Sequence, residues 1–361
     1  MNLTAFDFWI IFIGALVVTV IITPLSIKIA HKTGAMDIPK DDRRMHTKPI
    51  PRIGGMAIFA GVTLGILAAV WLGYCDDDPS PFVIPRIRIY GIVISGALMY
   101  ILGTIDDYVN LRPLVKLAGQ IVVATVVYAF GLRLSFISIG ADTTFTGIVC
   151  YIVTLIWIVG ITNTINLVDG LDGLAAGIVC IASLCNAYVA YIHGYYLACF
   201  PLLAVAGGCM GFLPFNFYPA KTFMGDGGSL FLGFMVAAFA LLEPVKSATV
   251  VAVIIPSLVL SLPILDTFFA IIRRLVAHKP IMEADKGHIH HRLMRAGLGQ
   301  RRTVLCMYGV CGIMSMAAIM VSRDLTTEAI GLGIIAVIYL YVLLTDPNRR
   351  SPRGDDHKED K

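Results

Sequence analysis

The sequence predicts an all-α membrane protein that crosses the bilayer about eleven times. Of its 361 residues, 57% are hydrophobic and only 14% are charged, and the mean hydropathy is +0.81. Soluble domains average roughly 45–50% apolar and about 25% charged residues. So apolar a chain needs lipid as its solvent, and a soluble protein of this size is nearly excluded.

Eleven apolar runs each approach the roughly 20 residues that a membrane helix needs. The first, from about Phe8 to Ala30, lacks the basic segment of a cleavable signal and is expected to remain as a span. The weakest division lies at His193-Gly194, between the sixth and seventh runs. The other runs lie at 53–74, 89–105, 115–131, 147–165, 173–193, 195–215, 228–243, 248–272, 303–322 and 328–345.

The positive charges fall mostly on one side of this arrangement. Of the 28 Lys and Arg residues, 23 lie in segments on one side and 5 on the other. The positive-inside rule then places the N-terminus outside and the C-terminus in the cytoplasm. We expect residues 1–345 to form one membrane domain and 346–361 a polar, disordered tail. The net charge of +4 is too small to imply a nucleic-acid partner.

Two adjacent carboxylates, Asp106 and Asp107, end the third run, and Asn110 and Lys116 follow them. Carboxylates beside hydrocarbon are costly, at about 2.5–3.5 kcal/mol for an aspartate at the bilayer centre. The pair is either a solvated helix cap or a cluster that holds a divalent cation or accepts a proton from a nucleophile. We favour the second interpretation.

Asn163, Asn166, Asp169 and Asp172 recur at every third position after the fifth run. On a helix this spacing forms one stripe, and glycines loosen the backbone where the stripe ends. Such a stripe can grip a polar ligand. Asparagine and aspartate before glycine are also ordinary turn formers, but a turn does not require four of them at strict spacing.

Asp226 lies among glycines at the start of the eighth run. Glycines there let backbone amides approach an anion, or let the carboxylate approach a metal. A flexible loop with a capping aspartate is an equal alternative. The motif alone is therefore a weak signal.

The longest inner loop contains His288, His290, His291 and Arg292. Three histidines can suggest zinc, but no cysteine accompanies them and the adjacent arginine disfavours a cation. We expect anion recognition, with attraction to anionic lipid headgroups as the alternative. Asp266, near the inner end of the preceding run, is expected to pair with one of the two arginines at 273 and 274.

In this order and on one membrane side, the polar segments resemble the polyprenyl-phosphate N-acetylhexosamine-1-phosphate transferase superfamily, glycosyl transferase family 4. The resemblance spans nearly the whole chain, from Lys48 through Arg292. Pro51-Arg52-Ile-Gly-Gly and His288-Ile-His-His-Arg are similar to the bacterial branch that begins teichoic acid, O-antigen and enterobacterial common antigen synthesis. The branch that handles the muramoyl pentapeptide typically has three successive histidines, and Arg292 stands in place of the third.

The resemblance implies transfer of N-acetylglucosamine 1-phosphate from UDP-N-acetylglucosamine to undecaprenyl phosphate, with release of UMP. It implies Mg²⁺, with Mn²⁺ as a substitute, held by Asn166 and Asp226, and catalysis by Asp106 and Asp107. Substrate contacts are expected from Asn110, Lys116, Asn163, Asp169, Asp172, His290, His291 and Arg292, with Lys48, Arg52 and His288 as weaker candidates.

The expected location is the cytoplasmic membrane, with the site on the cytoplasmic face and a homodimer left open. One alternative is a transferase of the same class that uses another UDP-N-acetylhexosamine or UDP-MurNAc-pentapeptide. A secondary transporter is the alternative of a different class. It would carry ionisable groups at the bilayer midplane and an internal repeat, whereas the acidic groups here lie at the inner ends of the runs.

Overall fold

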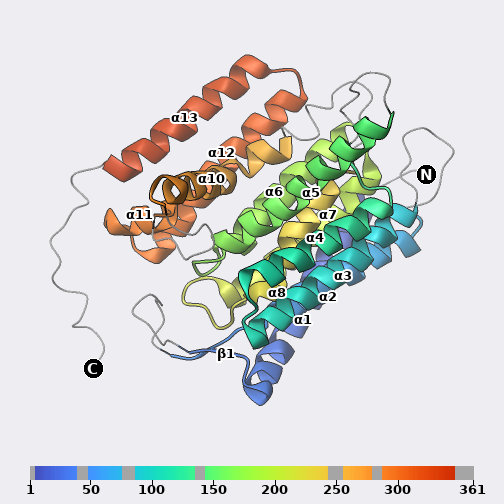
Figure 1. Ribbon diagram of the computed structural model, residues 1–361, viewed down its shortest axis with the longest axis horizontal. Helices are drawn as coiled ribbons and strands as arrows, with labels where there is room; N and C mark the ends of the chain where they lie inside the picture. Colours follow the sequence, from blue (N-terminus) through green and yellow to red (C-terminus); the bar gives the residue numbers. More distant parts are fainter. Residues whose placement is uncertain are drawn as a thin grey trace.

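The computed structural model describes residues 5–38, 48–74, 86–134, 143–242, 255–278 and 287–345. Within these ranges the fold is helical apart from one antiparallel hairpin, β1 (Met36–Asp37) with β2 (Ile50–Pro51). Figure 1 shows the long helices side by side, with the hairpin at one end of the bundle. The expected tail at 346–361 lies outside the described residues, so its disorder stays a prediction.

Helices occupy all eleven apolar runs, although the run at 248–272 is described only from residue 255. They are α1 (Ala5–Thr33), α2 (Gly55–Trp71), α3 (Arg86–Val109), α4 (Pro113–Ala129), α5 (Thr143–Val168), α6 (Leu174–Ile192), α7 (Tyr196–Asn216), α8 (Gly225–Ala240), α10 (Ser261–Val276), α12 (Gln300–Ser322) and α13 (Thr326–Thr345). A further short helix, α11 (Ile289–Arg295), lies outside the apolar runs.

Within the described ranges, seven helices are long and apolar enough to cross a membrane, and α2, α4 and α8 are shorter apolar helices. The chain is thus a multi-pass, all-helical membrane protein. The count of eleven crossings and the orientation of the ends remain predictions. The division at His193-Gly194 is correct, because α6 ends at Ile192 and α7 begins at Tyr196.

Helix α8 forms the buried centre of the bundle. Each of its residues except Asp226 is buried, as expected for a helix that is apolar on all sides. It packs against α3 and α5. Close approach requires glycine: a Cβ on Gly103 of α3 would lie 2.3 Å from the Asp226 carbonyl oxygen, and a Cβ on Gly55 would lie 2.5 Å from Gly228 Cα.

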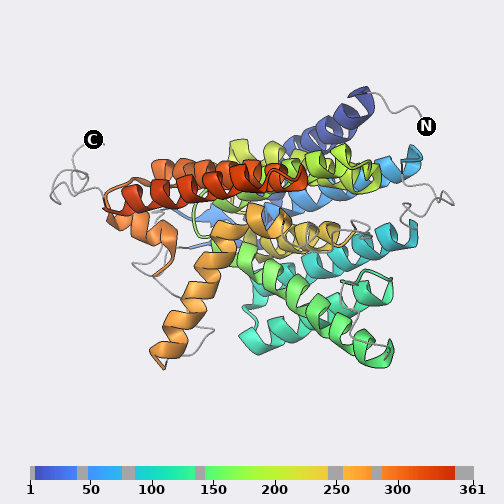
Figure 2. The same ribbon diagram turned by 90° about the horizontal axis from the view of Figure 1, so that it is seen from above.

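Helices α10 and α13 pack much more loosely. In α13 only Ala329, Ala336 and Leu343 are buried, and the large apolar side chains on its remaining faces are exposed, as a lipid-facing helix requires. Figure 2 shows α10, drawn in orange, leaving the layer of long helices at a steep angle.

The alternating direction of the helices determines where polar groups meet. The ends of α3, α5 and α7 lie beside the starts of α4, α6 and α8, and the β1–β2 hairpin lies at this same end (Figure 1). Backbone hydrogen bonds tie the hairpin to the start of α8, with Phe223 N donating to Pro51 O and Gly54 N donating to Phe223 O. The predicted motifs therefore gather at one end of the bundle.

Candidate active site

Asp226, at the start of α8, is the centre of the polar cluster. Its Oδ1 accepts hydrogen bonds from Asn166 Nδ2 at 2.6 Å and Lys116 Nζ at 3.1 Å. Its Oδ2 pairs with Arg52 Nη2 at 3.0 Å. These three partners come from α5, the first turn of α4 and the segment before α2. Three separate elements thus fix one carboxylate.

The adjacent aspartates at the end of α3 have different surroundings. Asp106 Oδ2 pairs with Lys116 Nζ at 2.9 Å, and its Oδ1 accepts from Leu111 N at 2.7 Å. Asp107 accepts from two backbone amides of α8, Asp226 N at 2.8 Å and Gly227 N at 2.9 Å. It also pairs with Arg52 Nε at 3.0 Å, and its side chain is only 2% exposed. Asp107 therefore caps α8 from a neighbouring helix.

Gly225 makes this cap sterically accessible. Its φ of +70° is a left-handed conformation that favours glycine. A Cβ there would lie 2.2 Å from the Arg52 carbonyl oxygen and 2.5 Å from Asp107 Oδ2. The glycine is thus required for both its backbone conformation and the approach of the aspartate.

The three asparagines predicted for the site have different surroundings. Asn166 Nδ2 also donates to Ser229 Oγ at 2.8 Å, and its Oδ1 accepts from Lys116 Nζ at 3.3 Å. Asn163 forms an amide pair with Gln120 of α4, with distances of 2.6 and 3.2 Å. Asn110 is exposed and adopts a φ of 52°, which ends α3. Only Asn166 of the three reaches the cavity described next.

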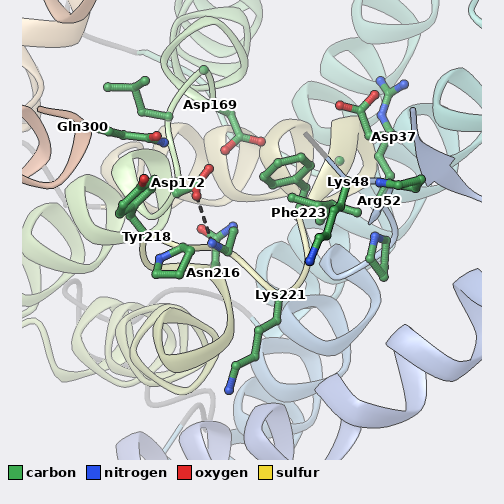
Figure 3. Close-up of a pocket in the computed structure, with 18 of the residues that line it drawn as sticks. Asp37, Lys48, Arg52, Asp169, Asp172, Asn216, Tyr218, Lys221, Phe223 and Gln300 are labelled. Carbon is green, nitrogen blue, oxygen red and sulfur yellow. Dashed lines mark hydrogen bonds between the residues drawn. The ribbon is translucent and has the colours of Figure 1, made fainter. Parts of the chain in front are cut away.

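A cavity of about 770 Å³ opens beside this cluster. In Figure 3, Asp169 and Asp172 lie on one side of it, with Arg52 and Lys48 on the opposite side. Of the residues predicted for the site, the cavity is lined by Lys48, Arg52, Asn166, Asp169, Asp172, Asp226 and His291. The predicted residues outside its lining are Asp106, Asp107, Asn110, Lys116, Asn163, His288, His290 and Arg292.

Asp169 and Asp172 lie in the connection between α5 and α6, beyond the helical stripe predicted for them. Asp172 Oδ2 accepts from Ala220 N at 2.9 Å. Burial raises the pKa of Asp169 well above its usual range, and the negative charges of Asp226 and Asp107 raise it further. A positive charge in the cavity would oppose both effects.

The histidine segment forms the start of α11. His291 reaches the cavity, whereas His290 is 2% exposed and lies behind Gly170. Burial and the neighbouring His291 lower the pKa of His290 to about 3, so its imidazole is neutral. Arg292 is exposed and does not line the cavity. Their roles in substrate binding stay predictions.

The expected pairing of Asp266 with Arg273 or Arg274 is wrong. Its carboxylate instead meets His288 Nδ1 at 3.0 Å and Ile289 N at 2.9 Å. Arg273 and Arg274 lie seven and eight residues further along α10, about two helical turns from Asp266.

Comparison with known proteins establishes the family. The sequence model of glycosyl transferase family 4 matches residues 89–243. A probable undecaprenyl-phosphate N-acetylglucosaminyl 1-phosphate transferase of Bacillus subtilis (strain 168) is 40% identical over 92% of this chain and 90% of its own length. The chain belongs to glycosyl transferase family 4.

Other relatives define its place in the family. A decaprenyl-phosphate N-acetylglucosaminephosphotransferase of Mycolicibacterium smegmatis is 36% identical over 90% of this chain and 85% of its own length. A phospho-N-acetylmuramoyl-pentapeptide-transferase of Anoxybacillus flavithermus is 29% identical over 82% of this chain and 92% of its own length. The protein is a phospho-sugar transferase of the bacterial polyprenyl-phosphate N-acetylglucosamine-1-phosphate branch, which excludes the transporter alternative.

The sequence did not predict several polar residues that support the site. Asn216, at the end of α7, accepts from Gly173 N at 3.1 Å and donates to Thr222 O at 3.0 Å, so it joins two loops of the cavity. Gln120 and Ser229 support the two asparagines of α5. Gln120 lies one turn after Lys116 on α4, so the spacing in the sequence could have placed both on the same face of the helix.

Proposed function

We propose that the protein transfers N-acetylglucosamine 1-phosphate from UDP-N-acetylglucosamine to undecaprenyl phosphate and releases UMP. The observation that carries this proposal is the Asp226 cluster, in which Lys116, Arg52 and Asn166 surround one carboxylate at the wall of an open cavity. The names of the Bacillus and Mycolicibacterium relatives, which specify N-acetylglucosamine, support the choice of sugar.

The donor set fits Mg²⁺. Within the described ranges, no group of three or more His, Cys, Asp or Glu side chains could hold a metal ion alone. Mg²⁺ is commonly bound by one or two carboxylates together with waters and substrate phosphates. Asp226 and the amide oxygen of Asn166, which both accept from Lys116 Nζ, would hold it at the cavity wall. When bound, Mg²⁺ would neutralise charge that develops on the diphosphate.

Charge placement explains what the side chains do. Attack of a phosphate on a diphosphate brings like charges together, so positioning and electrostatic stabilisation must overcome their repulsion. The cationic groups of Lys116 and Arg52 lie 3.1 and 3.0 Å from Asp226, where they can shift toward incoming phosphate oxygens. One aspartate of the pair at the end of α3 would accept a proton from the lipid phosphate, and Asp107 also supports the start of α8 through two backbone amides.

The proposed orientation places this end of the bundle at the cytoplasmic face of the cell membrane. The charge division supports it, because the predicted spans assign 23 of the 28 Lys and Arg residues to the inner side, together with the motifs of the candidate site. A cytosolic nucleotide sugar and a lipid headgroup can meet only where water and lipid adjoin. In this orientation the reaction would be the first membrane step of cell-wall or surface polysaccharide synthesis.

The test is an assay of purified protein in nanodiscs with undecaprenyl phosphate, Mg²⁺ and a panel of UDP-sugars, with UMP release measured. We expect the highest rate with UDP-N-acetylglucosamine. One phosphoanhydride breaks and another forms, so the equilibrium constant should lie within a decade or two of unity, about 1.4–2.8 kcal/mol. Labelled UMP should therefore be incorporated into nucleotide sugar in the reverse direction. A higher rate with UDP-MurNAc-pentapeptide would overturn the proposed sugar.

A further inference from the structure

Asp266 is a buried carboxylate of α10 that the proposed reaction does not use. The residue is 3% exposed. Its Oδ1 accepts a hydrogen bond from Ile289 N at 2.9 Å, and its Oδ2 lies 3.0 Å from His288 Nδ1. These two contacts join α10 to the start of α11. One carboxylate therefore fixes both the first turn of α11 and the ring of His288.

The three histidines continue from this contact to the cavity. The rings of His288 and His290 are parallel within 6°, with centroids 5.6 Å apart. The centroid of His290 lies 4.3 Å from that of His291, and His291 lines the cavity. A continuous series of ring contacts thus connects Asp266 with the cavity wall.

His290 also packs against the loop that carries two cavity aspartates. A Cβ on Gly170 would lie 3.2 Å from His290 Nε2, so this ring lies directly behind the loop between Asp169 and Asp172. His290 is almost fully buried. A displacement of its ring would therefore change the position of the loop, because close-packed interiors transmit small shifts.

We propose that Asp266 is a positioning residue for the nucleotide-sugar side of the active site. By holding His288 and the start of α11, it keeps His290 against Gly170 and His291 at the cavity wall. Asp266 does not line the cavity, so it acts through these neighbours. The inference rests on the proposed function, since it assigns His291 and the Asp169–Asp172 loop to the donor.

A positioning role differs measurably from a purely structural one. The cluster of Asp226, Asp106 and Lys116 lies on α8, α3 and α4, and Asp266 contacts none of these side chains. Loss of Asp266 should therefore affect binding of the donor more than binding of the lipid acceptor. General destabilisation would instead reduce the active fraction and leave both KM values unchanged.

The experiment measures KM and kcat for both substrates in Asp266→Ala, Asp266→Asn and His288→Ala. We expect Asp266→Ala to raise the KM for UDP-N-acetylglucosamine about tenfold or more, since small misplacements of positioning groups have effects of this size. The KM for undecaprenyl phosphate should change less than about twofold. Asp266→Asn should recover most of the loss, because its amide oxygen can still accept from Ile289 N. Binding of UMP, measured by calorimetry, should weaken in parallel.

The pair Asp266 and His291 is tested by a double-mutant cycle. If Asp266 acts partly through His291, the loss in the double variant Asp266→Ala/His291→Ala should be smaller than the product of the two single losses. Glu328→Gln, an exposed carboxylate in the first turn of α13, is the matched control and should leave both KM values unchanged.

Three results would overturn the inference: an unchanged donor KM in Asp266→Ala, equal changes for both substrates, or fully multiplicative effects in the cycle. His288→Ala keeps the inference testable if Asp266→Ala does not fold, because it removes the ring stack while leaving the contact with Ile289. An unchanged donor KM in His288→Ala would also contradict it. Failure of the wild-type protein to release UMP with any sugar would instead contradict the proposed function.

Discussion

The part of the chain through α8 and the part from α10 onward hold their polar groups in different ways. In the first, Asp226 is fixed by Arg52, Lys116 and Asn166, and its helix is buried on every side. In the second, the start of α11 is held to α10 by the carboxylate of Asp266. The reacting groups therefore lie in the densely packed part, while the loosely packed part supplies one wall of the cavity.

The residues matched by the family model end near the boundary between these two parts of the chain. The sequence model of the family covers residues 89–243, which span α3 to the end of α8, and it ends before α10. Most of the cluster around Asp226 lies within the matched residues, whereas Arg52 precedes them. A segment held by fewer contacts can vary in shape at lower cost, which suits it to distinguishing one sugar from another.

The largest effect should come from the rigid part, at its central carboxylate. Asp226→Asn should lower kcat by about a thousandfold or more, since it removes the charge that would hold Mg²⁺ and that balances Lys116 and Arg52. The volume of the side chain is unchanged, so the melting temperature in detergent should stay close to that of the wild type. UMP release measures the first quantity, and near-normal activity would move the metal site elsewhere.

Loss of the cap on α8 should reduce both stability and turnover. Asp107→Ala leaves the buried amides of Asp226 and Gly227 without their acceptor, and it leaves Arg52 with Asp226 as its remaining carboxylate in this cluster. We expect the free energy of unfolding to fall by about 2–4 kcal/mol, measured by chemical denaturation in detergent. Glu328→Ala serves as the exposed control. An unchanged stability would contradict the capping role.

The smallest effects should come from α11, and two adjacent residues there sharpen the contrast. His291→Ala should lower kcat/KM by about 10- to 100-fold, because His291 lines the cavity. Arg292→Ala should lower it less than about threefold, because Arg292 is exposed and does not line the cavity. The measurement is the rate of UMP release at limiting UDP-N-acetylglucosamine. A larger effect at Arg292 would restore the anion-binding role that its sequence predicts.

Residue type and membrane position were sufficient to predict that several polar side chains meet at one end of the bundle. Asp106, Lys116, Asn166 and Asp226 are polar groups at the ends of apolar runs, where only a function or a paired partner offsets the cost of placing them. The alternating direction of the runs then required these ends to lie on the same side. The eleven runs were found for the same reason, since hydropathy alone identifies them.

Side-chain pairings between distant segments were not predictable. Asp107 binds amides 119 and 120 residues away, and Asn163 pairs with Gln120 across 43 residues. Nothing in the local pattern distinguishes Asp107 from Asp106, because which carboxylate faces α8 depends on how α3 is rotated. The partner of Asp266 was missed for the same reason, as the sequence does not show where the chain returns after residue 278.

The cluster is built from the ends of successive helices, so its contacts form in a defined order during biosynthesis. Chains are made from the N-terminus, so Arg52, Asp107, Lys116 and Asn166 are synthesised before Asp226. Until α8 enters, Lys116 and Arg52 lack one of their two carboxylates and Asp107 lacks both of its amide donors. Insertion of α8 therefore completes several contacts at once, and a nascent chain that ends before this helix leaves Asp107 without its two amide donors.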